Sequence, residues 1–131
     1  MIFVDTSAFY ALADAGDPHH SDARRLLTAL LEKEEGLITH NYVLVETIAL
    51  IQHRMGAEAA VRFADSAAAF EIEWVDRALH EGALRAMKGT RRGKVSFVDQ
   101  VSFLVMRSRG LGEVFAFDRD FRREGFREYS D

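Results

Sequence analysis

The chain has 131 residues, of which 48% are hydrophobic and 29% charged, and it contains no cysteine. A chain of this length buries roughly two-thirds of its unfolded surface around one core, so we expect a single domain over residues 1–131. Lys and Arg total 17 against 21 Asp and Glu, a formal net charge of -4, which excludes a global basic field that attracts nucleic acid or an anionic membrane. The lack of cysteine excludes disulfides, thiolate zinc sites and cysteine nucleophiles.

The first half of the chain is predicted to alternate strands with helices. An apolar run over residues 2–4 is typical of a buried strand and ends at Asp5. Asp17 and Pro18 predict the N-cap and first position of a helix that ends before Gly36. Further along, the pattern predicts a strand at 37–38 and helices over 42–51, closed by Gly56, and over 57–69.

The second half continues the alternation. The predicted elements are a strand in FEIEWV (70–75), a helix over 76–87, a polar basic loop over 88–94, a helix from Ser96 to about Arg109 and a strand in EVFAF (113–117). Strands that alternate with helices imply a parallel sheet covered on both faces, so we expect an α/β fold with a central, mainly parallel sheet. The N-terminus lacks signal-peptide features and no apolar run approaches ~20 residues, so we expect a cytoplasmic protein without a membrane partner.

Two acids follow predicted strands. Asp5 comes directly after the first strand and Asp118 directly after EVFAF. In a parallel sheet, ligands bind near the carboxyl ends of the strands, where both acids are expected. Taken alone, each acid is better explained as a helix N-cap or a turn residue than as part of a ligand site.

Two more acids lie in apolar helices. The same-face helical neighbours of Glu46 are apolar, so we expect its carboxylate to be buried and to need a partner. Asp99 lies in SFVDQVSFLV, where its spacing from Ser96 is also that of a capping box.

The four acids together point to a metal site. If Asp5, Glu46, Asp99 and Asp118 converge, each pair at ~5 Å repels by about 3 kcal/mol at an effective dielectric of ~20. Such a cluster needs protons or cations. Ligation by oxygens alone favours Mg²⁺ or Mn²⁺ over zinc. The five histidines show no metal-ligand spacing, and we expect all of them to be exposed or half-buried.

The order of these motifs resembles a known family. FVDTSAFYAL and the following DPHHSDA, VLVETIALI, SFVD and FAFDRDFRREGF are, in order and spacing, similar to PIN-domain ribonucleases, most closely to the VapC toxins of type II toxin–antitoxin pairs. The resemblance implies a three-layer α/β/α sandwich in which Asp5, Glu46, Asp99 and Asp118 form the acidic metal site.

The resemblance also implies supporting roles. Thr6 matches the hydroxyl that supports the first acid and Ser96 the serine that precedes the third. Asp120 falls where relatives vary, and we interpret it as a solvated loop residue in preference to an outer ligand. Ala116 departs from the Thr or Ser that many relatives carry, which predicts weaker activity.

The implied function is a Mg²⁺- or Mn²⁺-dependent endoribonuclease, the toxin of a type II toxin–antitoxin pair. Asp5 and Asp99 would hold the principal ion directly, with Asp118 and Glu46 acting through water or on a second ion. The implied partners are RNA, a second copy of the chain and a VapB-like antitoxin. Local cations are candidates for binding the RNA backbone, although a solvated surface role is as good for each one: Lys88, Arg91, Arg92, Lys94 and Arg119.

Other functions fit less well. A phosphoacceptor receiver module needs a second acid where Thr6 stands and a lysine at a late strand end. A phosphatase of the haloacid dehalogenase type needs its D-x-D motif early, and nucleotide-cofactor binding needs a glycine-rich turn after the first strand. The remaining alternative is a catalytically weak or inactive PIN-like module that acts by binding RNA or protein.

Overall fold

The computed structural model describes residues 1–90 and 94–131, and its centre is a five-stranded sheet. The strands are β1 (Ile2–Val4), β2 (Leu37–His40), β3 (Glu71–Glu73), β4 (Glu113–Phe115) and β5 (Arg127–Glu128). They are ordered β3-β2-β1-β4-β5, and every neighbouring pair is parallel. The predicted parallel sheet is therefore confirmed.

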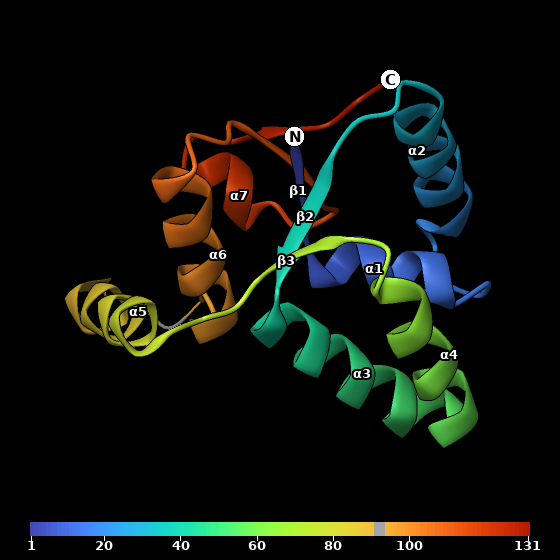
Figure 1. Cartoon of the computed structure of the whole chain (residues 1–131), viewed down its shortest axis with the longest axis horizontal. Helices are drawn as coiled ribbons and strands as arrows, with labels where there is room; N and C mark the ends of the chain where they lie inside the picture. The colour runs from blue at the N-terminus through green and yellow to red at the C-terminus, as the bar shows by residue number, and fades with distance from the viewer. Residues whose placement is uncertain (91–93) are drawn as a thin grey trace.

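Helices cover both faces of this sheet (Figure 1). They are α1 (Thr6–Ala13), α2 (His20–Glu32), α3 (Asn41–Met55), α4 (Ala57–Ala67), α5 (Arg77–Thr90), α6 (Phe97–Ser108) and α7 (Asp120–Arg123). In Figure 1, α1, α2 and α4 lie on one side of the strands and α5, α6 and α7 on the other, which is the expected three-layer arrangement. None of the described helices is long and apolar enough to cross a membrane.

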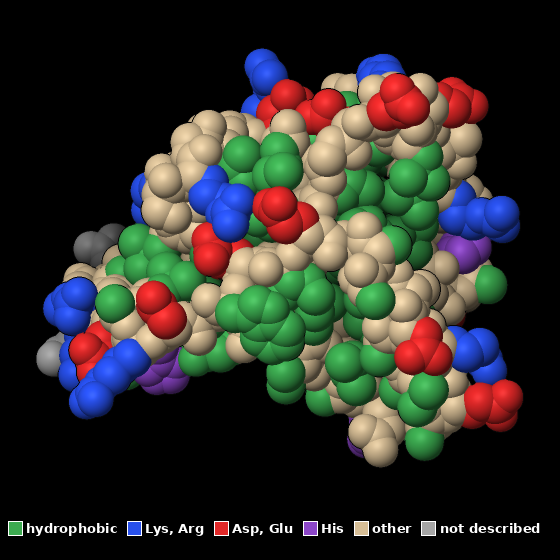
Figure 2. Space-filling model, in the orientation of Figure 1, with side chains coloured by type: hydrophobic (Ala, Val, Ile, Leu, Met, Phe, Trp, Pro, Cys, Tyr) green, Lys and Arg blue, Asp and Glu red, His purple; other side chains and the backbone are tan. Residues whose placement is uncertain are grey.

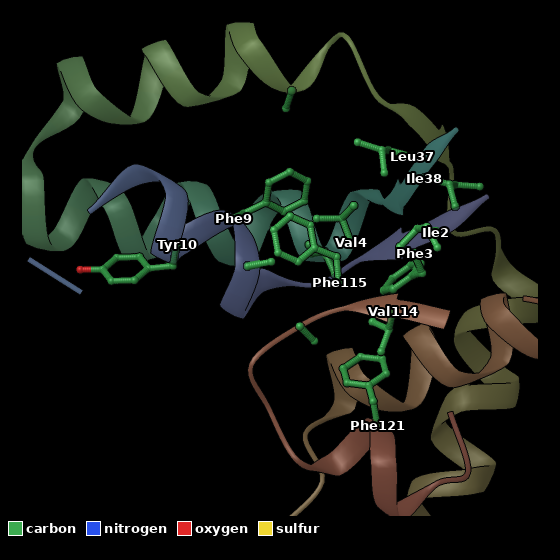
Figure 3. Close-up of a cluster of buried hydrophobic side chains, with 14 of the residues drawn as sticks. Ile2, Phe3, Val4, Phe9, Tyr10, Leu37, Ile38, Val114, Phe115 and Phe121 are labelled. Atoms are coloured by element: carbon green, nitrogen blue, oxygen red, sulfur yellow. The ribbon is translucent and has the colours of Figure 1, made fainter. Parts of the chain in front are cut away.

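The core forms because β1 is apolar throughout and lies in the middle of the sheet. All three of its residues are buried. Phe3 contacts Phe121 of α7 on one face, with ring centroids 6.3 Å apart, while Val4 lies toward Phe9 of α1 on the other (Figure 3). A central parallel strand needs apolar side chains on both faces, and IFV supplies them.

The element boundaries differ from the prediction at several places. Helix α1, which begins directly after Asp5, was not predicted. The predicted N-cap at Asp17 is wrong, because α2 begins at His20 with His19 at the N-cap position. Helix α5 extends to Thr90 into the predicted loop, and β3 contains only residues 71–73. Strand β3 is an edge strand that pairs only with β2. The sequence pattern did not predict α7 and β5, which are two of the shortest elements and rich in charged residues.

The strand order places a crevice beside β1. From β1 the chain continues to β2 and β3 on one side of it and then returns to β4 on its other side. The sheet therefore has its topological switch point between β1 and β4, and ligands of open α/β sheets bind at the carboxyl ends of such strands. Asp5 directly follows β1, and Asp118 follows β4 three residues after its end.

Candidate metal centre

A pocket of about 560 Å³ opens at this switch point. The acids that line it are Asp5, Asp17, Glu46, Asp99, Asp118 and Asp120. The structure thus brings all four predicted acids to one pocket from four separate segments of the chain.

Asp5 is buried, with an exposed fraction of 3%, and serves as the N-cap of α1. Its Oδ2 accepts hydrogen bonds from the backbone N–H of Ser7 at 3.1 Å and from the Ser7 hydroxyl at 2.7 Å. Burial raises the pKa of Asp5 to about 6, against the lowering effect of the Ser7 bonds. The capping role and the pocket role therefore coexist in this carboxylate.

The hydroxyl that bonds to Asp5 is that of Ser7 rather than that of Thr6, so the expectation for Thr6 is wrong in this respect. Ser7 Oγ also accepts the backbone N–H of Phe117 at 2.9 Å, and so ties the start of α1 to the segment after β4. Thr6 Oγ1 lines the pocket, is buried and has no hydrogen-bond partner among the described residues. A buried hydroxyl without a partner is costly unless water or a ligand satisfies it.

Asp99 is buried in the first turn of α6. Ser96 is the N-cap, and its Oγ accepts the Asp99 backbone N–H at 3.1 Å. Burial, together with the charges of Asp5 and Asp118, raises the pKa of Asp99 to about 7. Ser96 therefore has the capping role weighed from the sequence, and it also lines the pocket.

Carboxylate oxygens of Asp99, Asp118 and Asp120 lie within 4.8 Å of one another. Asp120 is half-buried, and its backbone N–H donates to Asp118 Oδ1 at 2.9 Å. Desolvation and the charge of Asp118 raise the pKa of Asp120, although Arg123 lies 3.3 Å away. The interpretation of Asp120 as a solvated loop residue is therefore wrong, because it belongs to the tightest group of acids among the described residues.

Glu46 lines the pocket but is exposed, so the expectation that it is buried is wrong. The apolar run around it does not make a fully buried helix, since the neighbouring Val45 is 64% exposed. Helix α3 buries Val43, Thr47 and Ile51 and leaves Glu46 at the pocket edge. Neither Glu46 nor Asp5 belongs to the 4.8 Å oxygen group.

Of the predicted RNA-binding cations that the structure describes, Lys94 alone is among the residues that line the pocket. Lys94 is exposed. Arg119 is exposed between Asp118 and Asp120, and Lys88 is exposed near the end of α5. Arg91 and Arg92 lie outside the described residues.

Six residues that line the pocket were not predicted as site residues: Ser7, Tyr10, Asp17, His19, Leu50 and Phe117. The Tyr10 hydroxyl donates to Asp14 at 2.8 Å, and the Arg54 guanidinium lies over its ring, 5.1 Å from the centroid. The signal available for Tyr10 and Leu50 was helical spacing, because Tyr10 lies four residues after Thr6 on α1 and Leu50 lies four residues after Glu46 on α3.

His40 differs from the expectation that every histidine is exposed or half-buried, because it is fully buried. Its Nδ1 accepts the Val43 backbone N–H at 3.2 Å, which caps α3, and its Nε2 lies 2.8 Å from Ser102 Oγ. Burial lowers the pKa of His40 to about 3, so the ring is neutral near pH 7. It is a structural residue that joins α3 to α6.

The acidic group fits a divalent ion. Its donors are all carboxylate oxygens, which suit hard cations. Burial together with mutual repulsion raises the pKa of Asp5, Asp99 and Asp120, which line the same pocket. The buried Thr6 hydroxyl adds a polar atom to the same pocket that lacks a partner within the described chain. Asp99, Asp118 and Asp120 could therefore hold a metal ion.

Comparison with known proteins gives consistent results. The PIN domain family model matches residues 2–126. The 23S rRNA-specific endonuclease VapC20 of Mycobacterium tuberculosis is 41% identical over 130 residues, which are 98% of this chain and 97% of that protein. The crystal structure of this VapC20, described as a sarcin–ricin loop cleaving toxin, has a TM-score of 0.88 at 39% identity and covers 96% of both chains. DNA-bound VapBC from Salmonella typhimurium has a similar fold, with a TM-score of 0.67 at 19% identity over 98% of both chains.

Proposed function

The chain belongs to the PIN domain family, and from this membership we propose that it is a metal-dependent endoribonuclease that cleaves 23S rRNA as the toxin of a toxin–antitoxin pair. The observation that carries the proposal is the single pocket where Asp5, Asp99 and Asp118 meet. The proposal assigns the activity to one domain over residues 1–131, acting in the cytoplasm.

Asp99, Asp118 and Asp120 are the proposed holders of the cation, with Asp5 and Glu46 beside them. Bound Mg²⁺ or Mn²⁺ supplies an activated water and neutralises charge on the phosphodiester. The Ser7 bonds fix the orientation of Asp5, and the Ser96 cap fixes the first turn that carries Asp99. The exposed Glu46 carboxylate at the pocket edge is placed to orient a water or to take up its proton.

Cations are needed for RNA to approach this pocket, because a polyanion is repelled by bare carboxylates. Lys94 lines the pocket and is the first candidate to contact the phosphate next to the scissile one. Arg119, Arg91 and Arg92 are proposed to contact phosphates further along the strand. Their side chains provide local positive charge that the net charge of -4 does not supply.

The test is a cleavage assay with 23S rRNA and with a synthetic RNA hairpin that carries the sarcin–ricin loop. The wild type is expected to cleave only with Mg²⁺ or Mn²⁺, and Asp99→Asn and Asp118→Asn to lose at least a hundredfold in rate. Asp65→Asn is the matched control, because Asp65 is exposed on α4 and does not line the pocket. Equal cleavage by the wild type and both pocket variants would reject the proposed centre.

The second candidate function is an inactive module that binds RNA or protein. It is favoured by Ala116, which is buried beside the pocket segment and offers no hydroxyl where many relatives carry one. Binding of the hairpin without cleavage, in either metal, would support this alternative. Cleavage that improves in Ala116→Ser would instead support a weakened nuclease.

An antitoxin is the proposed protein partner. A second pocket, of about 810 Å³, is lined mostly by apolar side chains, among them Leu12 of α1, Leu31 of α2 and Phe63 of α4. Figure 2 shows hydrophobic side chains at the surface between α2 and α4. We expect an amphipathic segment of the antitoxin to cover this groove, so Leu31→Glu should weaken the complex with the protein encoded by the neighbouring gene while RNA cleavage persists.

The chain is also proposed to form a homodimer. Light scattering of the purified protein at several concentrations tests this proposal. A molecular mass near 30 kDa is expected from the 14.8 kDa chain, and a constant value near 15 kDa would reject it.

A further inference from the structure

The geometry points to a base-binding platform in which the stacked rings of His19 and Phe117 hold one base of the RNA next to the scissile phosphate. This inference rests on the proposed nuclease function, because it names a substrate contact within the same pocket. It concerns two aromatic residues that line the pocket together with the acids.

The two rings form a parallel stack. Their centroids lie 4.5 Å apart and their planes differ by 11°. Phe117 is half-buried, whereas His19 is exposed. In such a pair the inner ring supports the outer one, and the second face of the exposed ring is available to a planar group.

The stack is held at a fixed position relative to the acids. The Phe117 backbone N–H donates to Ser7 Oγ at 2.9 Å, and the same hydroxyl donates to Asp5 at 2.7 Å. The His19 backbone N–H donates to Asp17 Oδ1 at 2.8 Å. Both rings are therefore tied to pocket residues, and Phe117 directly precedes Asp118 in the chain.

A nuclease of looped RNA has to hold an unstacked base while the phosphate beside it reacts. Single-stranded RNA is bound mainly by stacking of bases on aromatic side chains, histidine included, and each stack contributes about 1–3 kcal/mol. An exposed ring at the rim of an otherwise acidic pocket supplies such a contact. The carboxylates cannot supply a stacking contact with a base, and they repel phosphate.

The experiment measures kcat/KM with the sarcin–ricin loop hairpin and with two hairpins that carry an abasic site on either side of the mapped cut. His19→Ala and His19→Phe are compared with the wild type. His53→Ala is the matched control, because His53 is exposed on α3 and does not line the pocket. Mn²⁺ affinity, measured by calorimetry, checks that each variant keeps its metal centre.

On the intact hairpin, His19→Ala is expected to lose about 5- to 150-fold in kcat/KM, the factor that corresponds to one base stack. One of the abasic hairpins should cost the wild type a similar factor, and His19→Ala should lose nothing more on it. His19→Phe should stay within about threefold of the wild type, because it keeps a ring. Mn²⁺ affinity should be unchanged in all variants.

Three outcomes would overturn the platform. These are an unchanged rate in His19→Ala, equal losses on intact and abasic hairpins, and a loss in His19→Phe as large as that in His19→Ala. The last would assign His19 a role through its ring nitrogens.

Failure of the proposed function is distinguished by a binding measurement. If the wild type cleaves no RNA, the hairpin is labelled with 2-aminopurine beside the cut position expected in the loop and is titrated in Ca²⁺. Quenching by the wild type that His19→Ala loses and His19→Phe keeps would support the platform without catalysis. Equal quenching, or none, with all three proteins would reject the platform.

Discussion

At the scale of single residues, the pocket carboxylates combine local structural roles with a shared electrostatic one. Asp5 caps α1, and Asp118 accepts the Asp120 backbone N–H. These contacts hold each carboxylate at an element end, where a short polar side chain satisfies unpaired backbone groups. The same positions bury the carboxylates and bring their charges together, and burial is the larger cause of the raised pKa of Asp5 and of Asp99.

Asp99→Asn tests the raised pKa of Asp99 through the pH dependence of stability. The folded pKa of Asp99, about 7, lies above the ordinary value, so the metal-free folded chain binds more protons than the unfolded chain between about pH 4 and 7. Stability from this group therefore falls as pH rises through that window. We expect Asp99→Asn to match the wild type near pH 4 and to be about 2–4 kcal/mol more stable above pH 7 in EDTA.

Urea denaturation at several pH values measures this difference, and subtracting the two curves removes the titration of the other groups. A gap between the curves that does not change from pH 4 to pH 8 would contradict the raised pKa.

The hydroxyls of Ser7 and Thr6 are expected to contribute differently to stability. Ser7→Ala removes the hydroxyl that joins Asp5 to the Phe117 backbone, so we expect a loss of about 1–3 kcal/mol and at least tenfold weaker Mn²⁺ binding. Thr6→Val removes a hydroxyl without a partner in the described chain and should leave the free energy of unfolding of the metal-free protein within about 0.5 kcal/mol. Chemical denaturation and calorimetry measure both variants, and an equal destabilisation by the two would contradict this assignment.

At the scale of elements, the site depends on how the helices are joined. Gly56 ends α3 and caps α4 with φ 94° and ψ 168°, a conformation that side chains rarely adopt. Helix α3 carries Glu46 and Leu50, so the α3–α4 junction fixes one wall of the pocket.

Gly56→Ala is expected to destabilise the fold by about 1–3 kcal/mol, because the backbone is strained although the space around the added Cβ is open. Gly89→Ala is the matched control, since Gly89 lies in α5 with equally open space and no positive φ. That variant should be neutral or more stable by up to about 1 kcal/mol. Thermal unfolding of both variants gives the comparison, and similar changes would contradict the backbone argument.

The elements were largely predictable, because apolar runs and turn residues indicate strands and helix ends through local physics. The exposure of Glu46 was not predictable, because it depends on which apolar residues of α3 pack inward. Helix α3 packs so that even the apolar Val45 lies at the surface. The roles of Ser7 and Thr6 were not predictable either. The Ser7 hydroxyl accepts a hydrogen bond from the backbone N–H of Phe117, which lies 110 residues later in the chain. Similarly, no local pattern could reveal that His19 stacks on Phe117.

At the scale of the whole molecule, the pocket is expected to link metal binding to stability. An ion that binds only the folded chain stabilises it by about 3 kcal/mol at a hundredfold excess over Kd. Mn²⁺ should therefore raise the Tm of the wild type by several °C, and it should have little effect on Asp118→Asn. Scanning fluorimetry measures both, with Asp65→Asn as a control that should respond like the wild type.

A Tm shift of the same size in Asp118→Asn would place the ion elsewhere on the molecule.

The pocket draws on residues as far apart as Asp5 and Asp120, with β1 in the middle of the sheet and β4 added beside it. A nascent chain that has not yet reached residue 118 lacks two of the three clustered carboxylates, Asp118 and Asp120. The proposed metal centre is therefore incomplete until these residues have been synthesised and β4 has paired with β1.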